Sequence, residues 1–223
     1  MNGMMGHAGM AATAVRYLRS VGAPTTAATP ATSATPLPRP ALRAVRDDER
    51  APDERAPLDP AEFRAVLGHF ASSVTIITSP GESGGPGDPG PAGFTCQSFV
   101  SLSLDPPLVA FMVARTSTTW PRIARAGVFC VNILGAGQGS LCRTFAVSGA
   151  DKFAGVSYQP APATGSPRLP DVPAWIDCTI HAVHTGGDHL IVVGRVATLG
   201  TDPTAAETGP LLFHRGTFGH FAQ

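Results

Sequence analysis

Residues 93–108, GFTCQSFVSLSLDPPL, constrain the fold more than any other stretch, because polar and apolar side chains alternate along them. In a β-strand successive side chains point to opposite faces. One face then carries Thr95, Gln97, Phe99, Ser101 and Ser103, and the other Phe94, Cys96, Ser98, Val100, Leu102 and Leu104. The pattern predicts one strand with a mostly polar and a mostly apolar face, ended by a turn at Pro106 and Pro107.

The polar face of this strand is rich in short hydroxyls rather than in charges. A strand that only faced water would more often carry charged side chains, whereas hydroxyls lie flat beneath a planar, hydrogen-bonding ligand. We therefore expect a ligand wall here. The alternative is a partly exposed edge strand whose Ser and Thr reflect β-propensity and turn chemistry.

Further strands are expected at 73–79, 108–114, 129–134 and 210–221, and a hairpin over 175–200 that turns at Gly186, Gly187 and Asp188. Short helices are expected near 60–72, where Phe63, Val66, Leu67 and Phe70 share one face, and within 116–127 and 137–147. No strand-helix-strand unit repeats, and GAGQGS at 135–140 departs from the dinucleotide fingerprint at Ser140. This order favours a mainly β Greek-key barrel over a doubly wound sheet.

Composition divides the 223 residues into two parts. Residues 1–57 hold Ala, Thr and Pro runs and then a charged stretch, which predicts a disordered tail before a folded domain at 58–223. Net charge is zero, and seven of the 16 basic residues fall in the tail, which argues against nucleic-acid binding. Apolar runs are too short to span a bilayer, and four isolated cysteines without a zinc-ligand spacing predict reduced thiols in a cytoplasmic protein.

The pattern T-x-x-S-x-x-S-x-S-x-x-P-P-L, which starts at Thr95, resembles that of the flavin reductase-like family. The resemblance implies an FMN-binding split β-barrel that binds FMN, or alternatively FAD, and uses NADH or NADPH. It further implies flavin contacts from Thr95, Cys96, Gln97, Ser98 and Ser101, with Ser103 nearer the phosphate. Gln97 stands where relatives often have Asn, and Cys96 where Ala or Val is common, so the individual ring contacts are open.

A turn after the next strand offers a phosphate site, because a helix N-terminus supplies N–H donors and positive potential. Ala114 and Arg115 lead into Ser117, Thr118 and Thr119, one of which caps a helix that has Pro121 in its first turn. The cap and a charge-assisted bond from Arg115 fit a flavin phosphate. The alternative is an ordinary cap beside a solvated arginine.

Two more motifs match the same family. Asp151, Lys152, Phe153 and Gly155 match D-[KR]-F-x-G, where the only lysine of the chain would reach the flavin phosphate or the pyridine nucleotide. A turn with a solvated lysine and a buried Phe153 is the other interpretation. The sequence Gly187-Asp188-His189 matches G-D-H, whose histidine in the family lies beside the flavin where the nicotinamide stacks, although tight-turn chemistry explains it equally simply.

The resemblance therefore implies an NAD(P)H:flavin oxidoreductase in which His189 is the catalytic residue. The resemblance implies a homodimer that supplies reduced flavin to a partner monooxygenase by diffusion. A flavin-binding electron carrier or redox sensor without turnover would keep the hydroxyl strand but have no use for His189. A scaffold domain without flavin is the third hypothesis.

Overall fold

Two long antiparallel strands, β9 (Ala174–Gly186) and β10 (His189–Thr201), form the centre of the fold in this computed structural model, which describes residues 58–81 and 89–221. They are the hairpin that the sequence predicts, and the chain reverses at Gly187 and Asp188. Gly187 has φ of +67°, a conformation that glycine adopts without strain. The hairpin therefore follows directly from turn chemistry.

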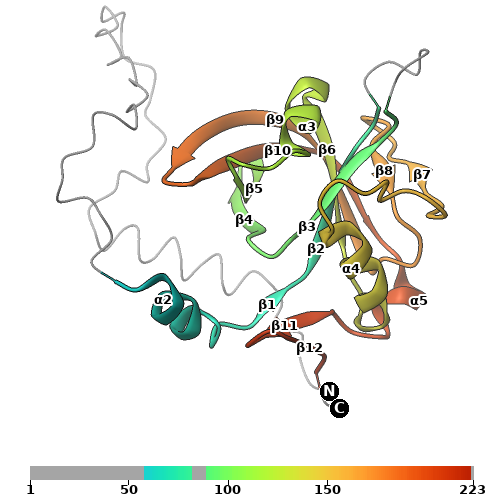
Figure 1. Ribbon diagram of the computed structural model, residues 1–223. Coiled ribbons are helices and arrows are strands. Elements are labelled where there is room, and N and C mark those ends of the chain that lie inside the picture. The colour runs from blue at the N-terminus through green and yellow to red at the C-terminus, as the bar shows by residue number, and fades with distance from the viewer. Residues whose placement is uncertain (1–57, 82–88, 222–223) are drawn as a thin grey trace, which may run out of the picture. The chain divides into compact units, whose positions relative to one another are not determined.

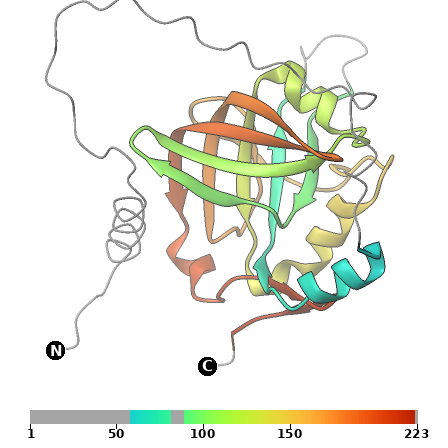
Figure 2. The same ribbon diagram turned by 90° about the vertical axis from the view of Figure 1, so that its left-hand side faces the viewer.

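In the described residues the main sheet has seven antiparallel strands in the order β3-β2-β6-β9-β10-β5-β4. The remaining members are β2 (Thr75–Ser79), β3 (Ala92–Cys96), β4 (Val100–Leu104), β5 (Pro107–Ala114) and β6 (Val128–Ile133). The sheet curls into a barrel (Figure 2), and its end strand β3 comes into contact with β5. The mainly β barrel expected from the sequence is confirmed.

Smaller elements surround the barrel (Figure 1). The helices are α2 (Pro60–Leu67), α3 (Trp120–Ala126), η3 (Ala136–Gln138), α4 (Gly139–Ala146) and α5 (Pro203–Ala206). Two minor sheets join β1 (Ser72–Ser73), β11 (Leu212–His214) and β12 (Thr217–Gly219), and β7 (Gln159–Pro160) with β8 (Pro167–Arg168). No helix in the described part of the chain combines the length and hydropathy of a membrane span.

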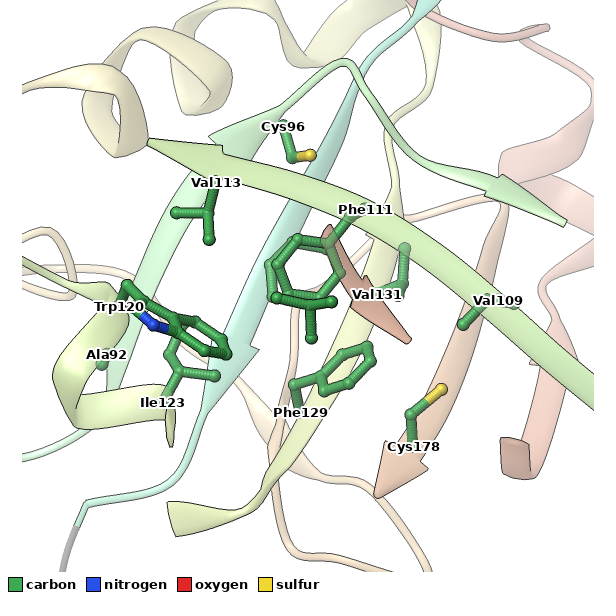
Figure 3. Close-up of a cluster of buried hydrophobic side chains, with 12 residues drawn as sticks. Ala92, Cys96, Val109, Phe111, Val113, Trp120, Ile123, Phe129, Val131 and Cys178 are labelled. Carbon is green, nitrogen blue, oxygen red and sulfur yellow. The ribbon is translucent and has the colours of Figure 1, made fainter. Parts of the chain in front are cut away.

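An aromatic cluster fills the barrel interior (Figure 3). The Phe111 ring packs edge-on against Phe129 and Trp120, with centroids 5.2 and 6.4 Å apart. Phe129 lies so close to the backbone of Gly194 that a Cβ there would come within 2.3 Å of its Cζ. A glycine is therefore required where β10 crosses this ring.

A fully buried carboxylate anchors the loop that follows β7. Asp177 on β9 accepts hydrogen bonds from the backbone N–H groups of Ala163 and Thr164 at 2.9 and 3.0 Å, and from the Thr164 hydroxyl. These bonds satisfy an ionised group inside the protein, where an unpaired charge would be costly.

Three sequence expectations need correction. Residues 93–104 are not one strand: β3 ends at Cys96, and a bend at 97–99 carries the chain to β4 at the opposite end of the sheet. The last expected strand is likewise split into β11 and β12, because Arg215 and Gly216 both have positive φ and reverse the chain. Helix α2 ends at Leu67 rather than near residue 72, and its apolar face is exposed, as Phe63, Val66 and Leu67 are 53, 64 and 54% accessible. The expected tail and its boundary lie outside the described residues.

Candidate functional site

A cavity of about 600 Å³, here called the trough, lies where β3, β5 and α4 converge. Four segments far apart in the sequence contribute to it. Its lining residues are Phe94, Thr95, Cys96, Gln97 and Ser98, then Met112, Val113, Ala114, Thr116, Ser117, Thr118 and Thr119, then Phe145, Ala146, Ser148 and Lys152, and finally His189.

The trough brings together most of the residues that the sequence singles out. Those that line it are Thr95, Cys96, Gln97, Ser98, Ala114, Ser117, Thr118, Lys152 and His189. The lining does not include Ser101, Ser103, Arg115 or Phe153. A larger cavity of about 730 Å³ around Trp175 contains none of the predicted residues.

Ser101 and Ser103 are carried away from the trough by the bend after Cys96. Both lie on β4, where Ser101 is exposed and Ser103 half-buried. The period-two pattern continues unbroken through the bend, so the sequence alone placed them on the wall with Thr95 and Gln97.

Ser98 closes the barrel beside the trough. Strand β4 pairs with β5 only as far as Ala110, which leaves Met112 without a strand partner on that side. The Ser98 hydroxyl takes that place: it accepts from the Met112 N–H at 2.9 Å and donates to the Met112 carbonyl at 3.0 Å. Ser98 therefore both lines the trough and holds the barrel closed at this point.

Thr95 and Cys96 are also engaged inside the protein. The Thr95 hydroxyl donates to the Cys142 carbonyl of α4 at 2.7 Å, and the Cys96 thiol lies 3.3 Å from the Ser98 hydroxyl. Burial raises the pKa of Cys96, so it stays a neutral thiol. Because a hydroxyl has one donor and two lone pairs, Thr95 and Ser98 can offer a ligand only acceptors. The Gln97 side chain is exposed and has no hydrogen-bond partner in the described residues, which leaves its amide able both to donate and to accept.

The turn after β5 keeps its own hydroxyls at the trough. The Ser117 hydroxyl accepts from the Trp120 N–H at 3.2 Å and so caps α3 from outside, while Thr118 is exposed. Arg115 is not among the residues that line the trough, and its backbone N–H donates to the Asp188 carbonyl at 3.0 Å. That bond ties the end of β5 to the tip of the β9–β10 hairpin.

The side chains of the adjacent residues Lys152 and Phe153 have different surroundings. The Lys152 ammonium donates to the Gly93 carbonyl at 3.0 Å and lines the trough. Burial, reinforced by the nearby Arg122 charge, lowers the pKa of Lys152. The Phe153 ring packs instead against Phe145, with centroids 5.0 Å apart. Phe153 is half-buried in this packing and does not line the trough, whereas Lys152 does.

His189 lies at the junction of two cavities. It is the first residue of β10, opposite Ala114 of β5, and its Nδ1 lies 2.8 Å from Asp188 Oδ1. Together with Gln97 it also lines a second cavity of about 620 Å³, which we call the α2 cavity and which Phe63, Arg64 and Leu67 of α2 help to form. In the neutral tautomer that carries its proton on Nδ1, the ring donates a hydrogen bond to Asp188 Oδ1 and Nε2 is left as an acceptor.

Helix α4 and the residues after it contribute side chains to the trough that were not expected from the sequence. Phe145, Ala146 and Ser148 line the trough from its end, because α4 packs so tightly on β3 that a Cβ on Gly93 would lie 2.8 Å from the Phe145 ring. No motif marks these residues. They reach the trough through a contact between segments some fifty residues apart, which local patterns do not encode.

A planar cofactor of flavin size fits this trough. Its volume lies within the roughly 300–1,000 Å³ of small-molecule sites. Apolar cover comes from Phe94, Val113 and Phe145, and polar groups come from Gln97 and the turn at 116–119. Apolar walls with a few convergent polar groups are what a fused, hydrogen-bonding ring system requires.

Comparison with known proteins matches this chain to a single family over most of its described length. The model of the flavin reductase like domain covers residues 67–222. A reductase subunit of a flavin-dependent monooxygenase, HsaB from Rhodococcus jostii (strain RHA1), is 47% identical over 161 residues, or 72% of this chain and 77% of the relative. An NADH:riboflavin 5'-phosphate oxidoreductase from Streptomyces pristinaespiralis is 38% identical over 164 residues, or 74% and 89% of the two chains.

A solved structure shares the same fold. The crystal structure of a nitrilotriacetate monooxygenase component B homologue from Mycobacterium thermoresistibile superimposes with a TM-score of 0.67 at 44% sequence identity. The match covers 73% of this chain and 86% of that one.

Proposed function

The chain belongs to the flavin reductase like family, and we propose that the trough is the place where it holds its flavin. The protein is an NAD(P)H:flavin oxidoreductase that supplies reduced flavin to a partner monooxygenase. One observation carries the assignment of the site: nine residues that the sequence singles out, from segments spread between Thr95 and His189, line one cavity of flavin size.

We propose FMN as the flavin, with FAD as the alternative, and NADH as the co-substrate. The name of the Streptomyces pristinaespiralis relative supports both choices. When bound, the flavin supplies the chemistry, since it accepts a hydride from the nicotinamide. The protein therefore needs no strong acid or base and acts by positioning.

The residues of the trough divide this work. Gln97 can donate to a ring carbonyl and accept from a ring N–H, whereas Thr95 and Ser98 can only accept because their hydroxyl protons are engaged within the protein. Ser117 keeps a hydroxyl donor, and Thr118 beside it is exposed to the cavity. These two hydroxyls would hold the phosphorylated side chain of the flavin.

His189 is proposed to position the nicotinamide. It separates the trough from the α2 cavity, so a co-substrate that enters from the α2 side would meet the flavin beside this ring. Asp188 fixes the imidazole through Nδ1. Replacement of His189 by Ala should slow hydride transfer in single-turnover experiments more than it weakens flavin binding. The control is His184→Ala, an exposed histidine on β9 outside both cavities. Equal rates of hydride transfer in His189→Ala and wild type would show that His189 serves only to form the hairpin turn.

Exposed apolar side chains support the proposal of a homodimer. Val100, Leu102 and Leu104 of β4 are 48, 53 and 76% accessible, and Met112 of the neighbouring β5 is 37% accessible. Such a patch on a sheet edge is typical of a protein interface. A dimer by sedimentation that Leu102→Glu converts to monomer would support this arrangement. We also propose a cytoplasmic location, which the four free buried thiols favour.

Turnover separates the reductase from a flavin-binding carrier or sensor. NADH and NADPH oxidation should be followed with FMN, FAD and riboflavin in parallel. Rapid flavin-dependent oxidation supports the reductase and ranks its substrates. Tight flavin binding without oxidation of either nucleotide would favour the carrier.

A further inference from the structure

The cavity of about 730 Å³ around Trp175, here called the Trp175 cavity, shares no residue with the trough or with the α2 cavity. Residues of β7, β8, the start of β9, the end of β10 and the start of α5 line it. Its volume lies within the roughly 300–1,000 Å³ of small-molecule sites. The flavin and the nicotinamide are assigned to other cavities, so the reduction of flavin leaves this one without a role.

Trp175 forms a fixed wall of the Trp175 cavity. It pairs with Gly200 on the neighbouring strand, and a Cβ on Gly200 would come within 2.7 Å of its Cζ2. The Arg168 guanidinium covers the ring, with Cζ 5.1 Å from the ring centroid. The residue is half-buried, and its indole N–H has no hydrogen-bond partner in the described part of the chain. Trp175 therefore offers a ligand an apolar edge and an unused donor.

Arg168 is held in place by neutral groups alone. Its guanidinium stacks on Trp175, and Nη2 donates to Oε1 of Gln159. It forms no ion pair with a carboxylate among residues 58–81 and 89–221. Because a guanidinium carries five N–H donors in one plane, most of them remain for a ligand. A positioned guanidinium with free donors is suited to binding a carboxylate.

Two carboxylates line the same cavity without pairing with Arg168. Asp202 Oδ1 accepts from the N–H groups of Thr204 and Ala205 at 3.0 and 3.1 Å, and its second oxygen has no partner in the described residues. Asp171 is exposed and makes no side-chain hydrogen bond there. Its φ of +55° is uncommon for a residue with a Cβ, and such conformations cluster at ligand sites.

This arrangement of charges discriminates between ligands. Arg168 would attract a simple anion, which Asp171 and Asp202 would repel, and a simple cation would meet the opposite balance. A ligand that carries both charges is favoured by all three groups, since complementary charges give specificity. The cavity therefore suits a zwitterion.

The apolar part of the Trp175 cavity is aromatic. Tyr158 is 44% accessible, yet its ring packs edge-on against Phe153 with centroids 5.5 Å apart. Tyr158 and the edge of Trp175 thus present two rings that are already fixed, and little ordering is needed when a ligand binds. Aromatic rings pair favourably with a further ring in edge-to-face or offset geometry.

We propose that the Trp175 cavity is a second ligand site, which binds a free aromatic amino acid. Arg168 holds the α-carboxylate, and Asp171 and Asp202 hold the α-ammonium group. The aromatic side chain packs against Tyr158 and Trp175. The site is separate from flavin reduction, and its occupancy is measured without flavin.

Titration of the flavin-free, full-length protein with L-phenylalanine tests the site. The chain has two tryptophans, and Trp120 lies in the barrel core, so two indole N–H resonances in an NMR spectrum distinguish the cavity from the core. L-phenylalanine should shift the Trp175 resonance saturably and leave that of Trp120 unmoved. Phenylpropionate and phenethylamine each carry only one of the two charges and should bind about tenfold more weakly or worse. Equal affinity for either analogue, or no shift at the solubility limit of L-phenylalanine, overturns the proposal.

Variants of opposite charge give a crossed pattern. Asp171→Asn keeps a residue that tolerates positive φ and should weaken the binding of L-phenylalanine and phenethylamine about tenfold, but not that of phenylpropionate. Arg168→Gln should weaken the binding of L-phenylalanine and phenylpropionate, but not that of phenethylamine. Glu207→Gln, a matched loss of charge on an exposed residue outside the cavity, should leave all three affinities unchanged. A general loss of packing would weaken all three ligands alike, and that result in Asp171→Asn would contradict the site.

Competition with flavin separates this site from the proposed function. L-phenylalanine should not displace FMN, because the Trp175 cavity and the trough share no residue. Displacement of FMN by L-phenylalanine would place the amino acid in the trough and overturn the second site. Protein that binds L-phenylalanine with the crossed pattern but binds no flavin would overturn the proposed function and leave the second site intact.

Discussion

Replacement of Ser98 by Ala tests the barrel closure beside the trough. The hydroxyl makes two hydrogen bonds with the main chain of Met112, at 2.9 and 3.0 Å, where no strand pairs with β5. At about 1 kcal/mol for each, their loss should lower the free energy of unfolding by about 2 kcal/mol. For a folded unit of this length, that corresponds to a decrease in Tm of about 4–8 °C.

The assay is thermal and urea unfolding of the flavin-free protein, because a bound ligand would mask the change by mass action. Ser101→Ala is the matched control: the same side chain is removed three residues later, on exposed β4, where the hydroxyl makes no hydrogen bond within the described residues. Ser101→Ala should leave Tm within about 1 °C of wild type. A loss below about 0.5 kcal/mol in Ser98→Ala, or an equal loss in both variants, would refute the closure by Ser98.

The remaining predictions concern the core. Gly194→Ala should lower the free energy of unfolding by about 1–3 kcal/mol, because the new Cβ would lie 2.3 Å from the buried Phe129 ring. The control is Gly219→Ala, which should cost much less because no atom lies within 4 Å of its new Cβ. Urea midpoints that fall equally in the two variants would contradict this account. Asp177→Ala removes the acceptor of three hydrogen bonds and should cost about 3 kcal/mol in urea unfolding, and a neutral effect would show that the loop is held otherwise. The four cysteines are all buried and should resist Ellman's reagent at neutral pH until the chain unfolds. For Cys178, burial and the Asp177 charge raise the pKa to about 12. Rapid labelling of the native protein would argue against this burial.

Local chemistry predicts those parts of the fold where turn residues are strong signals. The β9–β10 hairpin follows from Gly187 and Asp188 between two period-two runs, and it lies where the sequence places it. At 97–99 the chain also changes direction, yet Gln97, Ser98 and Phe99 include neither Gly nor Pro, and the alternation continues through them. The bend exists because the sheet must close on itself, which is a property of the whole barrel.

The same distinction applies to the site. Local patterns identified Thr95 through the hydroxyl-rich strand, Ser117 through the turn that leads into α3, and His189 through the G-D-H motif of the hairpin. Arg122 has no such mark: its position beside Lys152 depends on how α3 and the segment after α4 pack on β3. Long-range packing of this kind is not encoded in a window of neighbouring residues.

Strand register determines which side chain reaches the border between the two cavities. Strand β5 pairs with β10 without interruption, with Leu108 opposite Arg195 at one end and Ala114 opposite His189 at the other. On its other side β10 pairs with β9, and there the register shifts between Val193 and Gly194. A slip of one residue would exchange the two faces of β10 and bring a neighbour to the place of His189. The position of this imidazole can therefore change only in whole-residue steps. A gradual drift of loops cannot move it, and a single deletion between Gly194 and the hairpin tip would remove it from the trough altogether.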